Sequence, residues 1–171
     1  MGLASEPAGN RHVTAGRGKH GHDVKRPSMA RNLGWTRTMT VRVLVVDDEP
    51  DVEALFRQQF RREVREGLYM LDFALSAFGA LAILDDARGE KIILLISDIN
   101  MPGMSGLDLL PVVKTRRPDL PVFMISAYGD ADTVATAQAR GADEFLTKPV
   151  DFPKLKQDIM AVMTDATGGD R

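Results

Sequence analysis

The feature that most constrains the fold is a regular alternation of short apolar runs with helix-like segments, which starts at residue 41. The apolar runs are rich in β-branched residues and end abruptly in polar ones; they cover residues 41–46, 69–74, 92–97, 121–126 and 144–147. Runs of this length and composition, bounded by polar residues, predict buried β-strands.

The segments between these runs have helical periodicity. The apolar residues that follow Pro50 recur at the spacing of one helix face: Val52, Leu55, Phe56, Phe60 and Val64. This spacing predicts one amphipathic helix with these residues on its buried side. Further helices are predicted over residues 77–84, 106–114 and 130–140, and Gly141 is placed to end the last of them.

A final helix is predicted from about Asp151, with Pro153 near its first turn. Its apolar stripe consists of Leu155, Ile159 and Val162. Strands that are apolar throughout and alternate with amphipathic helices predict a parallel sheet covered on both faces, joined by right-handed crossovers.

We therefore expect an α/β domain over residues 39–166, a three-layer α/β/α sandwich with a five-stranded parallel sheet. Five βα units fit the flavodoxin-like strand order 2-1-3-4-5. Residues 167–171 are expected to form a short C-terminal tail, with no second domain after it.

Residues 1–38 differ in composition from the rest of the chain. They hold seven Lys and Arg against two acidic residues, a local charge of +5, and all three histidines, His12, His20 and His22. Without an apolar period they favour a disordered basic tail, or upstream sequence included by a misplaced start, since Met39 directly precedes the first strand. A metal-binding or nucleic-acid-binding arm and an organelle transit peptide are the alternatives.

The remainder of the chain is acidic, since a total charge of −2 leaves −7 beyond residue 38. Such a domain repels phosphate backbones, so we expect no nucleic-acid partner and instead a cation or a basic protein surface. The absence of cysteine excludes disulfides and thiol catalysis. No apolar run approaches the roughly 20 residues of a membrane helix, and no secretory signal is present, so we expect a cytoplasmic protein with no membrane partner.

Polar residues mark the carboxyl ends of four predicted strands. Asp47 and Asp48 follow the first strand, Asp98 the third, Ser126 ends the fourth and Lys148 follows the fifth. Ligands of open parallel sheets bind at this edge. Each residue alone is ordinary, since an Asp after a strand commonly caps a helix and a Ser commonly forms a turn. Three carboxylates, a hydroxyl and an ammonium on one edge together predict a chemical site.

The residue types indicate phosphoryl transfer with a divalent cation. Asp47, Asp48 and Asp98 repel one another when ionised, so a cation is needed, and oxygen ligands without His or Cys favour Mg²⁺. Asp98, on the central strand, is placed to act as the nucleophile that forms an acyl phosphate. Lys148 can pair with a phosphate oxygen, and Ser126 can donate a hydrogen bond to another.

Four motifs, taken together and in this order, resemble the receiver domains of two-component response regulators, in particular stand-alone regulators of the chemotaxis type. They are Val-Leu-Val-Val-Asp-Asp-Glu-Pro at 43–50, Ser-Asp-Ile-Asn-Met-Pro-Gly-Met-Ser-Gly at 97–106, Ser-Ala at 126–127 and Gly-Ala-Asp-Glu-Phe-Leu-Thr-Lys-Pro at 141–149. The resemblance extends over nearly all of the chain after the basic segment.

The resemblance implies a role for each matching residue. Asp98 matches the phosphoacceptor, Asp47 and Asp48 match the acid pair that binds Mg²⁺, Asn100 would give its backbone carbonyl to the metal, and Lys148 would contact the phosphate.

Two further positions match the switch of that family. Ser126 takes the position of its switch hydroxyl and Phe145 that of its switch aromatic, although a phenylalanine in a buried strand is by itself predicted to be core. The resemblance also implies a cis peptide bond before Pro149.

The expected function is a signalling switch that catalyses only its own phosphorylation and dephosphorylation, and is in that sense not an enzyme. Asp98 would accept the phosphoryl group of a sensor histidine kinase or a phosphotransfer protein in a phosphorelay. The segments 130–140, 144–147 and the final helix would then present a changed surface to a downstream protein. A monomer or a phosphorylation-dependent dimer is expected.

Two other functions are considered. A phosphatase of the haloacid-dehalogenase type also has an Asp nucleophile on a parallel α/β fold, but its nucleophile follows an early strand as Asp-x-Asp, whereas here the acid pair comes first and position 100 is Asn. A receiver that no longer switches and serves as an interaction scaffold is disfavoured by the complete set of site residues.

Overall fold

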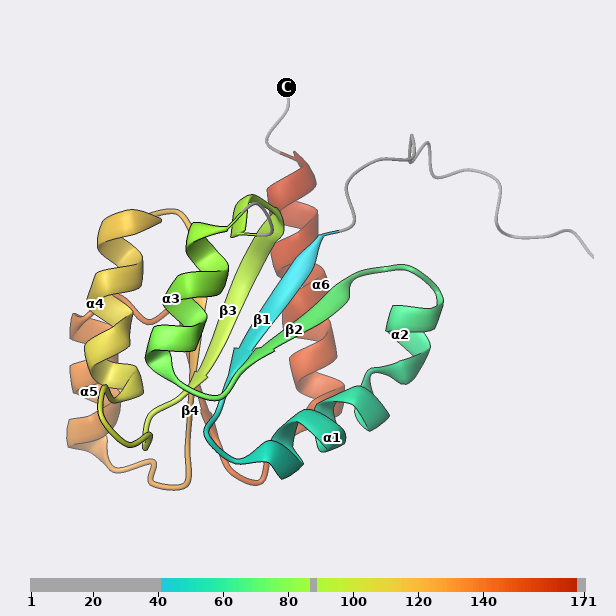
Figure 1. Ribbon diagram of the computed structural model, residues 1–171. Coiled ribbons are helices and arrows are strands. Elements are labelled where there is room, and N and C mark those ends of the chain that lie inside the picture. Colours follow the sequence, from blue (N-terminus) through green and yellow to red (C-terminus); the bar gives the residue numbers. More distant parts are fainter. Residues whose placement is uncertain (1–40, 87–88, 169–171) are drawn as a thin grey trace, which may run out of the picture. The chain divides into compact units, whose positions relative to one another are not determined.

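The five predicted strands form one parallel sheet in the order β2-β1-β3-β4-β5 (Figure 1), as expected from the sequence. The computed structural model describes residues 41–86 and 89–168. The strands are β1 (Arg42–Val46), β2 (Met70–Ala74), β3 (Ile92–Asp98), β4 (Val122–Ser126) and β5 (Glu144–Thr147). The helices are α1 (Pro50–Gln59), α2 (Arg61–Arg65), α3 (Ala77–Asp85), α4 (Gly106–Arg116), α5 (Ala131–Ala139) and α6 (Phe152–Gly168), with a short 3₁₀ turn, η1 (Gly89–Lys91).

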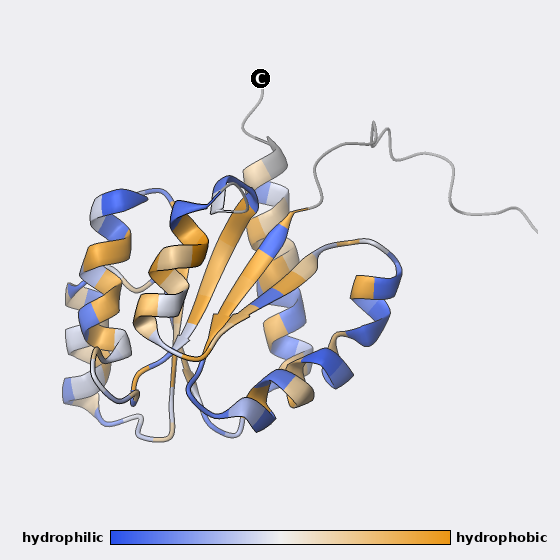
Figure 2. Cartoon of the chain, viewed as in Figure 1, coloured by the Kyte–Doolittle hydropathy of each residue, from blue (hydrophilic) through white to orange (hydrophobic). Residues whose placement is uncertain are grey.

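Helices cover both faces of the sheet, which confirms the three-layer α/β/α architecture. The helices α3, α4 and α5 pack on one face and α1 and α6 on the other (Figure 1). Successive strand residues alternate between the faces; Leu95 points to the first core and Ile96 to the second. Figure 2 shows the result as apolar strands between helices whose outer sides are polar.

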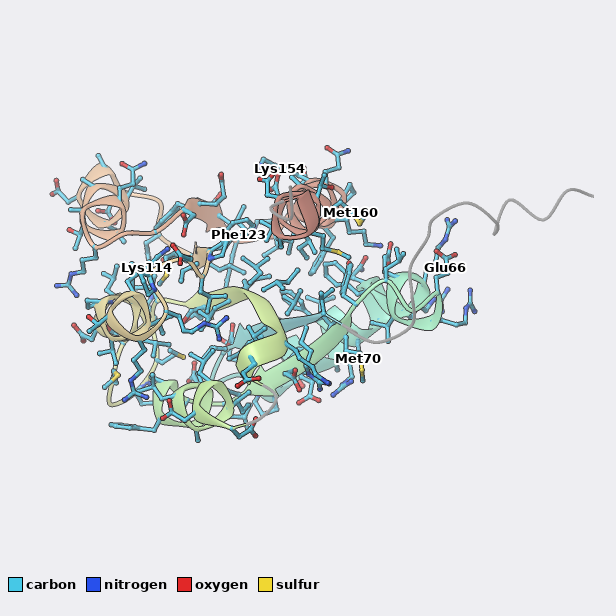
Figure 3. The ribbon with its side chains drawn as sticks, turned by 90° about the horizontal axis from the view of Figure 1, so that it is seen from above. Glu66, Met70, Lys114, Phe123, Lys154 and Met160 are labelled. Atoms are coloured by element: carbon cyan, nitrogen blue, oxygen red, sulfur yellow. The ribbon has the colours of Figure 1, made fainter. Side chains whose placement is uncertain are left out.

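The view from above in Figure 3 places Lys154 and Met160 on the outer side of α6 and Phe123 in the interior. Phe123 is buried with the core residues of α6, whereas Lys154 and Met160 are largely exposed. One side of α6 therefore covers the sheet and the other is exposed to solvent.

The strands differ in depth, and this difference bears on the site. β3 lies in the centre of the sheet and six of its seven residues are buried. β5 lies at an edge, and only one of its four residues is buried. β3 also runs one residue further than predicted, so that Asp98 is its last residue.

The single helix predicted after Pro50 is interrupted at Phe60, which separates α1 from α2. Phe60 has φ −100° and ψ 8°, outside the helical range, and its ring packs in an aromatic cluster with Phe56, Tyr69 and Phe152. The prediction that Leu55 and Val64 face the core is wrong; they are 42% and 38% exposed. Phe60 is fully buried at the break, whereas Leu55 within α1 and Val64 within α2 lie on exposed sides of their helices.

The later helix boundaries agree with the predicted signals. Gly141, two residues after the end of α5, has φ +100°, a conformation that glycine adopts without strain. Asp151 caps the first turn of α6 by accepting the backbone N–H of Lys154 at 3.0 Å. The helix continues to Gly168, two residues beyond the predicted end of the domain. The predicted basic tail, residues 1–38 with His12, His20 and His22, lies outside the described residues.

A proline inside α4 creates a contact that the sequence did not suggest. Pro111 has no N–H, so the carbonyl of Leu107 four residues earlier receives no helical hydrogen bond from it. Arg140 of the α5 end donates to this carbonyl at 2.6 Å and also pairs with Asp108 at 3.1 Å. The missing helical bond thus becomes a link between α4 and α5.

Candidate functional site

Three predicted site residues meet at the carboxyl edge of the sheet. Asp98 ends the central strand and Asp47 directly follows β1; they are only 5% and 8% exposed. Lys148, which directly follows β5, reaches between them. Its Nζ lies 2.8 Å from Asp98 Oδ1 and 3.3 Å from Asp47 Oδ2. One ammonium therefore bridges two buried carboxylates, whose combined charge it only half neutralises.

Burial and charge compete at Asp98. Burial raises the pKa of the Asp98 carboxyl, and the nearby charge of Asp47 adds to this effect. The hydrogen bond and the charge of Lys148, together with the backbone N–H of Asn100, act in the opposite direction, but the net pKa remains above its ordinary value. A carboxylate that is poorly stabilised by its surroundings gains from a further cation.

Lys148 is held in its charged form. Burial on its own would lower its pKa, but the hydrogen bond and charge of Asp98, followed by those of Asp47, outweigh it and raise the pKa. The lysine is therefore a fixed positive charge at neutral pH, as its predicted contact with a phosphate oxygen requires.

Ser126 is fully buried at the end of β4, on the strand next to Asp98. Asp98 pairs in register with Ile125, so Ser126 lies one residue further toward the edge. Its Oγ accepts the backbone N–H of Tyr128 at 3.0 Å, and its carbonyl accepts the N–H of Lys148 at 2.9 Å. The hydroxyl thus has a fixed position, and its own proton is left to serve as a donor.

The segment that leaves Asp98 is held by its backbone. The N–H of Ile99 donates to the carbonyl of Ile125 at 3.0 Å, and the N–H of Gly106 donates to the carbonyl of Ile99 at 2.9 Å. A Cβ on Gly106 would lie 2.0 Å from the carbonyl oxygen of Asp98, so only glycine fits there. Gly106 belongs to one of the motifs of the family resemblance, and its lack of a side chain allows α4 to begin against the backbone of Asp98.

The remaining predicted ligands lie beside this cluster. Asp48 is half-buried and Asn100 is exposed. The Lys148–Pro149 peptide bond is cis, as the family resemblance implied. The assignments of Asp48, and of the Asn100 carbonyl, to a metal stay predictions.

The donor set fits Mg²⁺. Among the described residues no group of three or more His, Cys, Asp or Glu is already gathered for a metal ion. Magnesium does not need one, because it typically takes one or two carboxylates and keeps water or phosphate oxygens at its other positions. Asp47 and Asp98 offer two buried carboxylates with an uncompensated negative charge.

Phe145 lies in β5 beside a hollow of about 280 Å³. It is half-buried and packs against the core on the α3–α4–α5 side, so the expectation that it is a core residue is only partly met. The hollow lies between Phe145 and the α5 residues Val134 and Gln138. The role of Phe145 as a switch aromatic stays a prediction.

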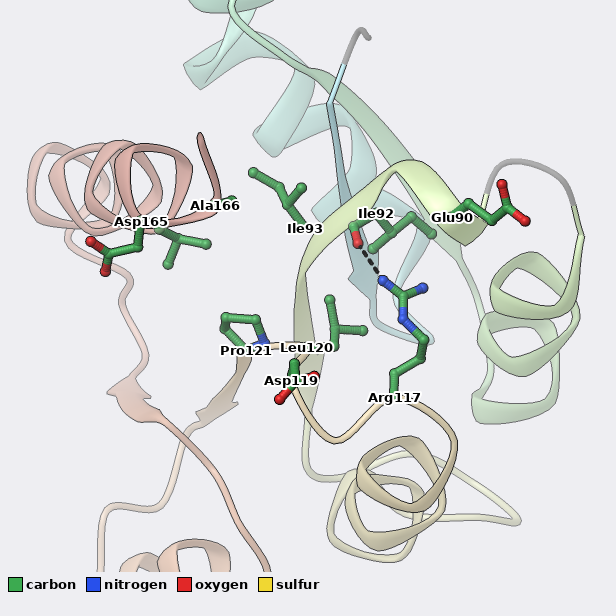
Figure 4. A pocket seen from close by; sticks show the side chains of 10 residues that line it. Glu90, Ile92, Ile93, Arg117, Asp119, Leu120, Pro121, Asp165 and Ala166 are labelled. Carbon is green, nitrogen blue, oxygen red and sulfur yellow. Dashed lines mark hydrogen bonds between the residues drawn. The ribbon is translucent and has the colours of Figure 1, made fainter. Parts of the chain in front are cut away.

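A second hollow, of about 410 Å³, lies at the opposite, amino edge of the strands (Figure 4). Beside it Arg117 donates to the carbonyl of Ile92 at 3.0 Å and to that of Gly89 at 2.7 Å. Both bonds hold the backbone at the start of β3, so Arg117 supports the sheet and not the site at the other edge.

The chain is thus an α/β protein with a doubly wound five-stranded parallel sheet and an Asp–Asp–Lys cluster at its carboxyl edge. A family model, the response regulator receiver domain, matches residues 43–160. The chain belongs to this family and carries the receiver domain of a response regulator in two-component signalling. This membership sets aside the haloacid-dehalogenase alternative.

Curated relatives agree with this assignment. The chain is 39% identical over 122 residues to the response regulator protein PilR of Pseudomonas aeruginosa, covering 71% of this chain and 26% of that protein. It is 36% identical over 116 residues to the two-component response regulator ARR14 of Arabidopsis thaliana, covering 68% of this chain and 29% of that protein. The chain thus spans about a quarter of the length of these relatives.

Solved structures share the fold. A response regulator receiver domain protein from Clostridium thermocellum superimposes with a TM-score of 0.66 at 27% identity, covering 74% of this chain and 97% of that one. The signal receiver domain of a putative LuxO repressor protein from Vibrio parahaemolyticus gives 0.67 at 26% identity, covering 77% and 96%. In the described part of the chain, none of the helices is long and apolar enough to span a membrane.

Proposed function

We propose that Asp98 accepts a phosphoryl group in a Mg²⁺-dependent reaction and that the phosphorylated domain switches a protein-interaction surface. The observation that carries the proposal is the buried Asp98 carboxylate, which ends the central strand in direct contact with Lys148 and shares that lysine with Asp47. Receiver domains generally use Mg²⁺ for phosphorylation and interact with histidine kinases and downstream targets.

In the proposed reaction an oxygen of Asp98 attacks the phosphorus of a phosphohistidine. The new O–P bond forms as the P–N bond breaks, and the imidazole nitrogen keeps the electron pair and takes a proton from solvent. Bound Mg²⁺, held by Asp47 and Asp98, would neutralise charge on the phosphoryl oxygens. Lys148, now on Asp98 Oδ1, then pairs with a phosphoryl oxygen.

The hydroxyl of Ser126 completes the contacts. It accepts the N–H of Tyr128 and donates its own proton to a second phosphoryl oxygen, which draws the β4–α5 connection toward Asp98. Moving a two-state equilibrium from mostly off to mostly on takes about 5.5 kcal/mol of differential stabilisation. Charge-assisted hydrogen bonds contribute roughly 1.5–3 kcal/mol each, so two at the upper end of this range or three near its middle supply that energy.

The responding surface is formed by α5, β5 and α6. Ser126 and Lys148 lie at the ends of β4 and β5, and the hollow beside Phe145 opens between β5 and α5. Phe145 can fill space that the moving connection vacates, which changes this surface for a downstream protein. We propose in addition that the protein turns over no other substrate.

Labelling by acetyl phosphate tests the acceptor. The protein should take up one phosphoryl group when Mg²⁺ is present and none after chelation, and Asp98→Ala should abolish uptake. Asp119→Ala, which removes an exposed carboxylate at the amino edge of the sheet, is the matched control. Persistent labelling of Asp98→Ala would refute the assignment of the acceptor.

A second measurement separates a working switch from an interaction scaffold. Beryllofluoride with Mg²⁺, which mimics an acyl phosphate, should change the NMR spectrum at α5, β5 and α6 or change the oligomeric state. An unchanged spectrum and mass would favour the scaffold.

That the protein acts as a stand-alone regulator in the cytoplasm also stays a prediction.

A further inference from the structure

Two buried polar atoms at the α2–β2 corner have no hydrogen-bond partner among the residues that the structure describes: the hydroxyl of Tyr69 and Oε2 of Glu63. Tyr69 is fully buried immediately before β2, and Glu63 lies in α2. A buried polar atom without a partner costs about 1–3 kcal/mol, which makes such atoms rare and in need of an explanation.

The two atoms have complementary hydrogen-bonding character. Burial, together with the charge of Glu63, raises the pKa of Tyr69, so its hydroxyl stays protonated and can donate. Burial alone would raise the pKa of Glu63, but the hydrogen bond from Lys156 and the bond from its own backbone N–H hold it below its ordinary value. Glu63 is therefore an ionised acceptor, and the Tyr69 hydroxyl is a donor close enough to be affected by its charge.

The surroundings hold both groups in place. Lys156 of α6 pairs with Oε1 of Glu63 at 3.0 Å, and its Nζ lies 5.4 Å from the centre of the Phe60 ring. The ring of Phe60 packs edge-on against that of Tyr69, with centroids 6.1 Å apart. Because Lys156 already occupies Oε1, Oε2 is the oxygen of this carboxylate that is left without a partner among the described residues.

We propose that this corner is a binding site for one buried water molecule, which accepts a hydrogen bond from Tyr69 and donates one to Oε2 of Glu63. A buried water typically makes two to four hydrogen bonds to groups that otherwise lack partners. The water joins β2, α2 and, through Glu63 and Lys156, α6. This site is remote from Asp98 and does not depend on the proposed phosphorylation.

A crystal structure of the unmodified protein at a resolution that shows ordered water is the direct test. A peak within hydrogen-bond distance of both Tyr69 Oη and Glu63 Oε2 supports the site. A direct bond between the two side chains, or a corner without a peak, overturns it.

Substitution provides an energetic test. Tyr69→Phe removes the donor but keeps the ring, and should raise the unfolding equilibrium constant on the order of tenfold, because the water and Oε2 lose a partner. The matched control is Tyr128→Phe, since the side chain of Tyr128 is largely exposed and the change should leave the constant within about twofold. If Tyr69→Phe leaves stability unchanged or increases it, the hydroxyl has no bridging water and the proposal fails.

Discussion

Removal of the Lys148 ammonium should destabilise the protein in a pH-dependent manner. In Lys148→Met the stem is retained but both contacts of Nζ, at 2.8 Å to Asp98 and 3.3 Å to Asp47, are lost. At an effective dielectric constant of about 20 each contact has a gross Coulomb energy of about 5–6 kcal/mol. The desolvation cost of the lysine, which the variant avoids, offsets much of this energy.

The net loss follows from the burial of the two acids. Removing one partner of a fully buried ion pair typically costs about 3–5 kcal/mol. Lys148 is 30% exposed, so solvent already screens part of the interaction, and we expect a loss of about 2–3 kcal/mol at pH 7.

The pH dependence follows from the pKa of Asp98. This pKa is raised in the folded protein, mainly by burial, so the folded state binds the proton more tightly and stability falls as the pH rises above the ordinary carboxyl range. Lys148 lowers the same pKa, and its loss raises it further. The deficit of Lys148→Met should therefore be largest at neutral pH and shrink as the pH falls toward about 4, because Asp98 in the folded variant then takes up a proton and no longer needs the lysine.

Urea unfolding followed by circular dichroism at several pH values between 4 and 8 measures this difference. Lys91→Met, at an exposed lysine in η1, is the matched control and should show no such trend. Equal deficits at all pH values, or a variant more stable than the parent at pH 7, would refute the view that Lys148 compensates two buried carboxylates.

Three further substitutions probe the site and the fold that supports it. Gly106→Ala places a Cβ 2.0 Å from the Asp98 carbonyl oxygen, so the backbone must shift; acetyl-phosphate labelling should slow at least tenfold and thermal melting should fall. Arg42→Met leaves Asp72, 7% exposed, without its bidentate partner and should cost about 2–4 kcal/mol in urea unfolding, whereas a loss below 0.5 kcal/mol would contradict a structural role. Leu155→Ala removes a fully buried side chain from the core under α6 and should cost about 2–5 kcal/mol by the same measurement, with labelling of Asp98 retained.

Much of the fold could be predicted because local pattern and tertiary structure agree. The apolar strands are buried on both faces, so each is a continuous apolar run whose polar end marks the edge of the sheet. The break at Phe60 could not be predicted in the same way. Phe60 continues the four-residue spacing from Phe56, and only its packing against Tyr69 and Phe152 decides that the helix ends there.

The sequence predicted which residues share the site but not which of their side chains are in contact. Strand order alone brings Asp47, Asp98 and Lys148 to one edge. That the lysine bridges these two acids depends on side-chain geometry, which a linear pattern does not encode. The close approach of Gly106 to the backbone of Asp98 likewise depends on the path of the connecting segment, and a glycine in a motif is only a weak signal for it.

Because β3 is more deeply buried than β5, the two sides of the site should differ in how easily they move. Asp98 is attached to the central strand, which is paired on both sides and almost wholly buried, whereas Lys148 follows the shallow edge strand. Local opening is easiest where few groups are buried. If Asp98 is phosphorylated as proposed, a force between the phosphoryl group and its partners would displace the β5 side more readily than β3. Asp98 would then keep its position, and the structural change would be concentrated on the β5 side, which the proposal assigns to the downstream partner.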